Sequence, residues 1–135
     1  MKICMGKTIT CILIDDDPDD HEIFKIAIQE TSMPVSCHFF HSWTEANKYL
    51  QNNAIFAPDF IFMDWYLSGV QGTDYLIRLK QIPKLVKSQF VVYSGFVQSD
   101  ITLNLLETYN CKYLQKSGSI TTTATELKAM LELAA

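Results

Sequence analysis

A few acidic, hydroxyl and basic side chains in this sequence have the types that phosphorus chemistry requires. Asp15, Asp16 and Asp17 form an acidic run, and Asp64 ends an apolar segment much later in the chain. Carboxylates gathered in one small site repel one another unless a cation neutralises their charge. An oxygen-rich site of this kind suits Mg²⁺, and a carboxylate can act as a nucleophile. The acids therefore predict a magnesium site in which Asp64 attacks phosphorus.

Two further residues fit the same chemistry. Ser94 offers a hydroxyl group that can donate a hydrogen bond to a phosphoryl oxygen. Lys116 offers a flexible positive charge beside an incoming phosphoryl group. We therefore predict that Asp64, Ser94 and Lys116 carry the reaction and that the early acids hold the metal.

Five short segments rich in apolar residues must position these side chains. Each is followed by a loop and by apolar residues at helical spacing, which predicts five strand–helix units. The predicted strands are Ile9–Ile14, Val35–His41, Asp59–Met63, Gln89–Tyr93 and Lys112–Gln115.

Helix boundaries are marked by capping residues. Asp17 can cap a helix that has Pro18 at its first position, and Ser42 begins a capping-box pattern. A stripe of apolar residues from Ile120 to Leu131 predicts the last helix, and Pro83 is expected to end the third.

The polarity of the strands predicts their order. The first, third and fourth strands are apolar on both faces, as central parallel strands are, whereas Ser36 and Lys112 mark the second and fifth as edges. Right-handed crossovers then give the order 2-1-3-4-5, a doubly wound, flavodoxin-like α/β fold. Ligands bind such folds at the carboxyl ends of the strands, where all the candidate residues fall. We also place Gly69, Gly72, Gly95 and Gly118 in the loops at this edge.

Composition narrows the class of protein. The chain has 135 residues, 48% of them hydrophobic and 19% charged, which predicts one domain over residues 1–135. A net charge of −4 disfavours nucleic-acid binding and an anionic membrane surface. No apolar run reaches the roughly 18 residues of a membrane span, and no secretory signal is evident, so we expect a cytoplasmic protein.

Neither cysteine nor histidine has the spacing of a metal site. The four cysteines form no C-x-x-C pair, so we expect reduced, structural thiols. His21, His38 and His41 share no ligand spacing and are expected to be surface or structural residues.

Four segments resemble the receiver domains of two-component response regulators, and the resemblance extends over nearly the whole chain. They match the family's acidic pair, phosphoacceptor, hydroxyl residue and lysine in order. The segments are residues 14–17 (IDDD), 62–65 (FMDW), 92–95 (VYSG) and 114–116 (LQK).

The resemblance implies a role for each residue of the acidic site. Asp64 is the phosphoacceptor, and Asp16, Asp64 and the backbone carbonyl of Tyr66 would bind Mg²⁺, while Asp15 would hold a metal-bound water. Ser94 and Tyr113 would form the conformational switch. The phosphoryl donor would be a histidine kinase or a histidine phosphotransfer protein.

Two positions depart from the family pattern. The family has proline four residues after the phosphoacceptor and directly after the lysine, where this chain has Ser68 and Ser117. The second proline follows a cis peptide bond. Here the Lys116–Ser117 bond is either trans, with a rearranged loop, or a strained cis bond that costs about 2.5 to 4 kcal/mol.

Two other functions are weighed against a receiver. A haloacid-dehalogenase-type phosphatase also uses an aspartate and Mg²⁺, but residues 15–18 (DDDP) lack that family's hydroxyl residue. An interaction module that works without phosphorylation would not require the whole set of site residues. We predict a stand-alone receiver, monomeric or weakly dimeric, that catalyses only its own phosphorylation and dephosphorylation. It would act as a phosphorelay intermediate or bind an unidentified protein target through helix four, strand five and helix five.

Overall fold

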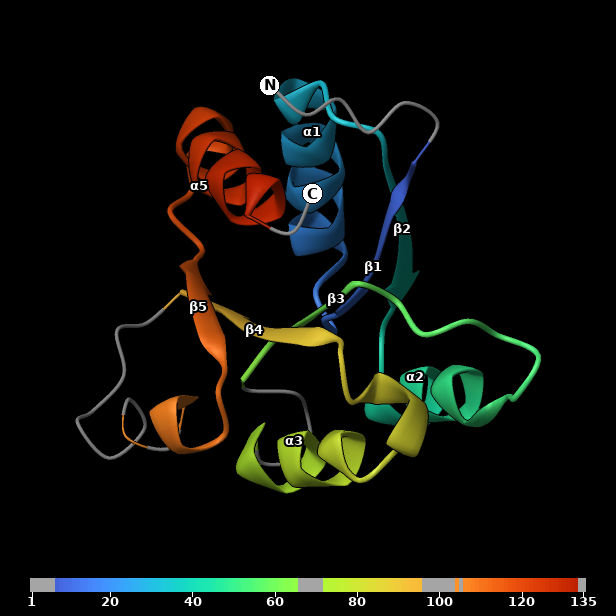
Figure 1. Cartoon of the computed structure of the whole chain (residues 1–135). Helices are drawn as coiled ribbons and strands as arrows, with labels where there is room; N and C mark the ends of the chain where they lie inside the picture. The colour runs from blue at the N-terminus through green and yellow to red at the C-terminus, as the bar shows by residue number, and fades with distance from the viewer. Residues whose placement is uncertain (1–6, 66–71, 96–103, 105, 134–135) are drawn as a thin grey trace.

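The structure is a computed structural model that describes residues 7–65, 72–95, 104 and 106–133 (Figure 1). Its strands form one fully parallel sheet in the order β2-β1-β3-β4-β5, which confirms the predicted order and edges. The strands are β1 (Ile9–Ile14), β2 (Val35–Phe40), β3 (Phe60–Met63), β4 (Gln89–Ser94) and β5 (Lys112–Gln115).

Burial explains which strands are central. Every residue of β3 is buried, whereas every residue of the edge strand β2 is intermediate or exposed. The predicted strands differ from the observed ones by one residue at three ends: β2 ends at Phe40, β3 begins at Phe60, and β4 extends to Ser94. The apolar pattern therefore located the strands, while hydrogen bonding sets their ends.

Helices cover both faces of the sheet (Figure 1). α1 and α5 lie side by side on one face, and α2 and α3 lie on the other. Each face of the sheet has its own apolar cluster, and none of the described helices is long and apolar enough to cross a bilayer. The helices within the described residues include α1 (Pro18–Thr31), α2 (Trp43–Gln51), α3 (Gly72–Lys80) and α5 (Ile120–Glu132), with a 3-10 helix, η1 (Pro83–Leu85).

The predicted caps are present. The side chain of Asp17 accepts a hydrogen bond from the backbone N of Asp19 at 2.9 Å, and Pro18 occupies the first turn of α1. Ser42 caps α2 by accepting from the backbone N of Glu45 at 3.2 Å. α3 ends at Lys80, three residues before Pro83, which begins η1. These contacts satisfy amide groups that a helix end leaves unpaired.

The prediction for Gly72 was wrong. We expected it in a loop, but it is the first residue of α3 and is buried. A Cβ atom at this position would lie 2.4 Å from the ring of Trp65, the residue after Asp64. A glycine is therefore needed for α3 to approach that ring closely.

The amino end of β3 is held by a compact set of hydrogen bonds around Asp59. Its carboxylate accepts from the backbone N of Thr10 at 2.9 Å and from the Thr10 hydroxyl at 3.2 Å. Its backbone N donates to the Thr10 carbonyl at 2.8 Å, and its carbonyl accepts from the N of Gln89 at 2.9 Å. Asp59 thus joins three strands through neutral partners.

Candidate functional site

The carboxyl ends of the central strands bring the predicted site residues together. Backbone hydrogen bonds of the sheet continue one step past the strands: Asp15 N donates to Phe40 O at 2.9 Å, and Asp64 N donates to Ile14 O at 2.9 Å. Lys116 N donates to Ser94 O at 2.8 Å in the same way. The sheet itself therefore fixes the backbone from which each of these side chains extends.

Three carboxylates form a compact acidic cluster at this edge. One oxygen from each of Asp15, Asp16 and Asp64 lies within 4.8 Å of the other two. Asp15 is completely buried and Asp64 is 9% exposed, whereas Asp16 is exposed. Hard oxygen ligands with one side open to water are the donor set that Mg²⁺ prefers. The residues fit a small divalent cation by type and by spacing.

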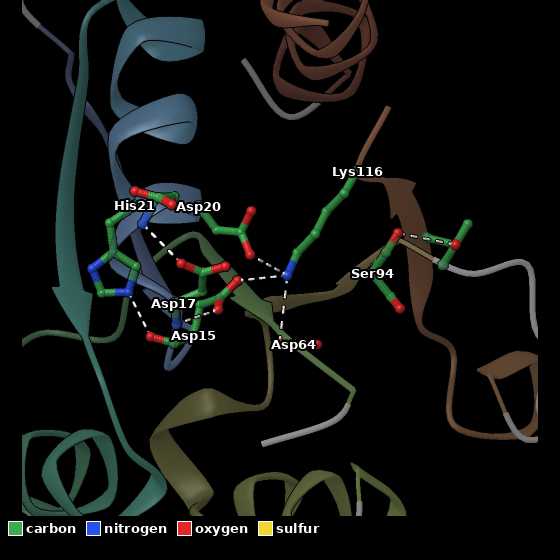
Figure 2. A network of polar contacts seen from close by, with 9 residues as sticks. Asp15, Asp17, Asp20, His21, Asp64, Ser94 and Lys116 are labelled. Atoms are coloured by element: carbon green, nitrogen blue, oxygen red, sulfur yellow. Dashed lines mark hydrogen bonds and ion pairs between the residues drawn. The ribbon is translucent and has the colours of Figure 1, made fainter. Parts of the chain in front are cut away.

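Lys116 reaches into the cluster from the end of β5 (Figure 2). Its Nζ lies 2.9 Å from Asp15 Oδ2 and 3.5 Å from Asp64 Oδ2. A third carboxylate, Asp20 on the first turn of α1, lies at only 2.7 Å. Lys116 Nζ also lies 5.2 Å from the centroid of the Tyr93 ring. The sequence analysis singled out Lys116 but not Asp20, because an acid in the first turn of a helix is common and needs no partner beyond the helix dipole.

Burial and charge act against each other on these groups. Burial raises the pKa of Asp15 to about 6, outweighing the contact with Lys116 and the backbone hydrogen bond from Asp17. Burial alone would lower the pKa of Lys116, but its contacts with Asp20 and Asp15 raise that pKa above the usual value. Lys116 therefore keeps its positive charge, whereas ionisation of the neighbouring Asp15 carboxylate is less favourable than in water.

The loop between β1 and α1 is held by contacts on both sides of Asp15. Asp15 Oδ1 accepts from the backbone N of Asp17 at 2.9 Å, which leaves Oδ2 facing Lys116. His21 Nε2 donates to the Asp15 carbonyl at 2.6 Å, and the His21 ring stacks on His41 at 4.4 Å. His21 is a buried structural residue, which agrees with its expected class.

Ser94 and Tyr113 lie on the neighbouring strands β4 and β5, where Ser94 pairs with Gln115 and Tyr113 pairs with Val92. Ser94 is 1% exposed, and the Tyr113 hydroxyl donates to the Ser94 carbonyl at 3.2 Å. None of the described residues has a cis peptide bond, so Lys116–Ser117 is trans. The following loop turns at Gly118, whose φ is +78°, and Ser119 then caps α5. Of the two alternatives for the Lys116–Ser117 bond, the structure has the trans bond.

Three positions named in the sequence analysis lie outside the described residues. They are Tyr66, whose backbone carbonyl is expected as a metal ligand, Ser68 and Gly69.

The sequence of residues 11–132 matches the response regulator receiver domain family. This chain belongs to that family. It is 26% identical over 130 residues to the phosphate regulon transcriptional regulatory protein PhoB of Pseudomonas aeruginosa. That alignment covers 94% of this chain and 52% of PhoB, so the chain spans about half the length of this relative.

Solved receiver structures share the fold. The phosphorylated cyanobacterial phytochrome response regulator RcpA has a TM-score of 0.79 and 22% identity, with 93% of each chain covered. The Mn²⁺-bound form of the response regulator Rcp1 has a TM-score of 0.75 and 17% identity, covering 90% of this chain and 91% of that one. At these identities the likeness concerns the fold, and it agrees with the doubly wound sheet described above.

Family membership places the chain in two-component signalling, in which receiver domains provide phosphorylation-controlled regulation. Receiver domains are generally not classical enzymes. This result favours the receiver interpretation over a haloacid-dehalogenase-type phosphatase.

Proposed function

We propose that this receiver accepts a phosphoryl group on Asp64 from a phosphohistidine donor in the presence of Mg²⁺. The observation that carries the proposal is the convergence of Asp64 with two further carboxylates and Lys116 at one sheet edge. Asp59, at the other end of the same strand, has no such surroundings among the described residues.

The proposed transfer requires a nucleophile, a leaving group and charge neutralisation. An oxygen of the Asp64 carboxylate forms a bond to phosphorus as the phosphorus–nitrogen bond to the donor histidine breaks, and the imidazole leaves and takes up a proton. The product is an acyl phosphate, which water later hydrolyses. Mg²⁺, bound by Asp16 and Asp64 with Asp15 holding a metal-bound water, would offset the negative charge of the incoming group. Tyr66 would supply a further ligand through its backbone carbonyl.

Lys116 and Ser94 are proposed to contact the phosphoryl oxygens. Lys116 is already within 3.5 Å of Asp64, and the buried Ser94 lies at the end of the neighbouring strand β4. Because Tyr113 donates to the Ser94 carbonyl, a movement of Ser94 would be transmitted to this ring. We therefore propose Ser94 and Tyr113 as the switch.

The proposed partners follow from this chemistry. The donor is a histidine kinase or a histidine phosphotransfer protein, and the output is contact with another protein. A groove of about 420 Å³ between β5 and α5 lies beside Tyr113 and includes Met130 and Leu133. The groove belongs to the face of helix four, strand five and helix five that is predicted to bind the target. The domain would act as a switch or as a phosphorelay intermediate.

The protein incubated with acetyl phosphate provides the test. We expect one phosphoryl adduct by intact mass, formed with Mg²⁺ and prevented by a chelator. Hydroxylamine at neutral pH should remove the adduct, because it cleaves acyl phosphates but not phosphate esters of serine. An adduct that forms equally well with the chelator, or that resists hydroxylamine, would contradict the proposal. A protein that takes up no phosphoryl group would support an interaction module that works without phosphorylation.

A further inference from the structure

The shortest contact of Lys116 is with a carboxylate outside the acidic cluster. Asp20 Oδ2 lies 2.7 Å from the ammonium nitrogen, compared with 2.9 Å for Asp15 and 3.5 Å for Asp64. The side chains of Lys116 and Asp20 are only 16% and 18% exposed, so water screens this pair less than an ordinary surface pair. In the absence of a phosphoryl group, Asp20 is therefore the nearest of the three carboxylates that contact the Lys116 ammonium.

Both partners are held by rigid elements that lie far apart in the sequence. Asp20 belongs to the first turn of α1, whose start is fixed by the Asp17 cap. Lys116 follows β5, and its backbone N is bonded to Ser94 O. The ring of Tyr93 supports the ammonium from the sheet side. Figure 2 shows the lysine extended toward α1, with Asp20 and Asp15 ahead of it.

We propose that Asp20 is a positioning residue that holds Lys116 toward α1 while Asp64 is unmodified and competes with the phosphoryl group for it. The inference rests on the proposed function of Asp64. An ammonium has three N–H donors, and here three carboxylates surround it. A phosphoryl group on Asp64 brings strong acceptor oxygens and nearly two negative charges. Lys116 then shifts from Asp20 toward the phosphoryl group.

This competition has a measurable consequence. Any free energy that the unmodified protein gains from the Asp20–Lys116 contact opposes formation of the modified state. Removing the Asp20 charge should therefore favour a phosphoryl group, or an analogue of one, at Asp64. Asp20 thus sets the balance between the two states without itself contacting the transferred group.

The test uses beryllium trifluoride, a phosphoryl analogue, with Mg²⁺ and the full chain. Binding is followed by tryptophan fluorescence, because Trp65 directly follows Asp64 and is buried. Asp20→Asn should lower the apparent dissociation constant about fivefold, which corresponds to about 1 kcal/mol of lost competition. Asp20→Glu, which keeps the charge, should restore a value close to that of the wild type.

Two controls separate the lysine contact from a general effect of charge or folding. Asp19→Asn removes the same charge from the neighbouring, exposed residue of α1 and should leave the dissociation constant unchanged. In a Lys116→Met background, Asp20→Asn should lose its effect, because its partner is absent. Urea unfolding without Mg²⁺ should also reveal energetic coupling between Asp20 and Lys116 in the same set of variants.

The outcomes distinguish the two proposals. A wild-type protein that does not bind beryllium trifluoride would overturn the proposed function of Asp64 and, with it, this inference. If the wild type binds, three results would overturn the role of Asp20 alone. These are equal effects of Asp20→Asn and Asp19→Asn, an undiminished effect in Lys116→Met, and weaker binding by Asp20→Asn.

Discussion

The two aspartates that flank β3 show that one residue type can have a structural role at one end of a strand and a chemical role at the other. Asp59 precedes Phe60, and its carboxylate accepts hydrogen bonds from neutral groups of Thr10. Asp64 follows Met63, and its carboxylate lies among two other acids with Lys116 at 3.5 Å. The first carboxylate is satisfied by the fold, whereas the second is held close to like charges.

The difference shows where the fold accepts unfavourable electrostatics. Neutral donors stabilise the Asp59 charge without creating a demand for a ligand. The cluster around Asp64 holds three carboxylates against one lysine, so a further cation reduces the repulsion. The amino end of β3 is therefore structural, and its carboxyl end is arranged to bind and react.

The largest expected effect is the pH dependence of stability without metal. The pKa of Asp15 is raised from 3.8 to about 6 in the folded protein, so the folded state holds the proton more tightly than the unfolded state. The resulting stability is complete below pH 3.8 and is lost as the pH rises through about 6. The two pKa values limit the loss to about 3 kcal/mol. Urea unfolding with a chelator, from about pH 4 to about pH 7, should show this loss relative to Asp15→Asn. Parallel profiles for the two proteins would contradict it.

Mg²⁺ should reverse part of this penalty, since it binds the native cluster and not the unfolded chain. At about a hundred times its dissociation constant, the free energy of unfolding should rise by about 2.7 kcal/mol. Asp59→Asn should keep this response, and Asp64→Asn should lose most of it. Thermal melts of the three proteins at several Mg²⁺ concentrations measure the effect. A wild-type melting temperature that does not respond to millimolar Mg²⁺ would remove the distinction between the two ends of β3.

A pair of isosteric variants sharpens the comparison without any ligand. In the presence of a chelator, Asp64→Asn should raise the free energy of unfolding by about 1 kcal/mol, because it relieves repulsion among the acids. Asp59→Asn should lower it by about 0.5 kcal/mol, because it replaces charge-assisted hydrogen bonds with neutral ones. Urea unfolding of both variants provides the measurement. The same sign for both changes would mean that the two carboxylates do not differ in this way.

The sequence predicted the sheet well, because a strand that is buried on both faces of a parallel sheet is a continuous run of apolar residues. The apolar runs of β1, β3 and β4 located the centre, and the residues after them located the acidic cluster. Asp20 was missed because its role depends on the packing of α1 beside α5, which brings it to a lysine 96 residues away. Gly72 was misplaced because its requirement comes from the Trp65 ring, which α3 approaches closely in the folded structure. Contacts that form only when the chain is packed, whether between near or distant residues, leave no local pattern in the sequence.

The phosphoryl group itself tests the central claim most directly. Wild type, Asp59→Asn and Asp64→Asn are incubated with acetyl phosphate and Mg²⁺, and their intact masses are compared. We predict one adduct on the wild type and on Asp59→Asn, in similar yield, and none on Asp64→Asn. An adduct of undiminished yield on Asp64→Asn would contradict the assignment of Asp64 as the phosphoacceptor.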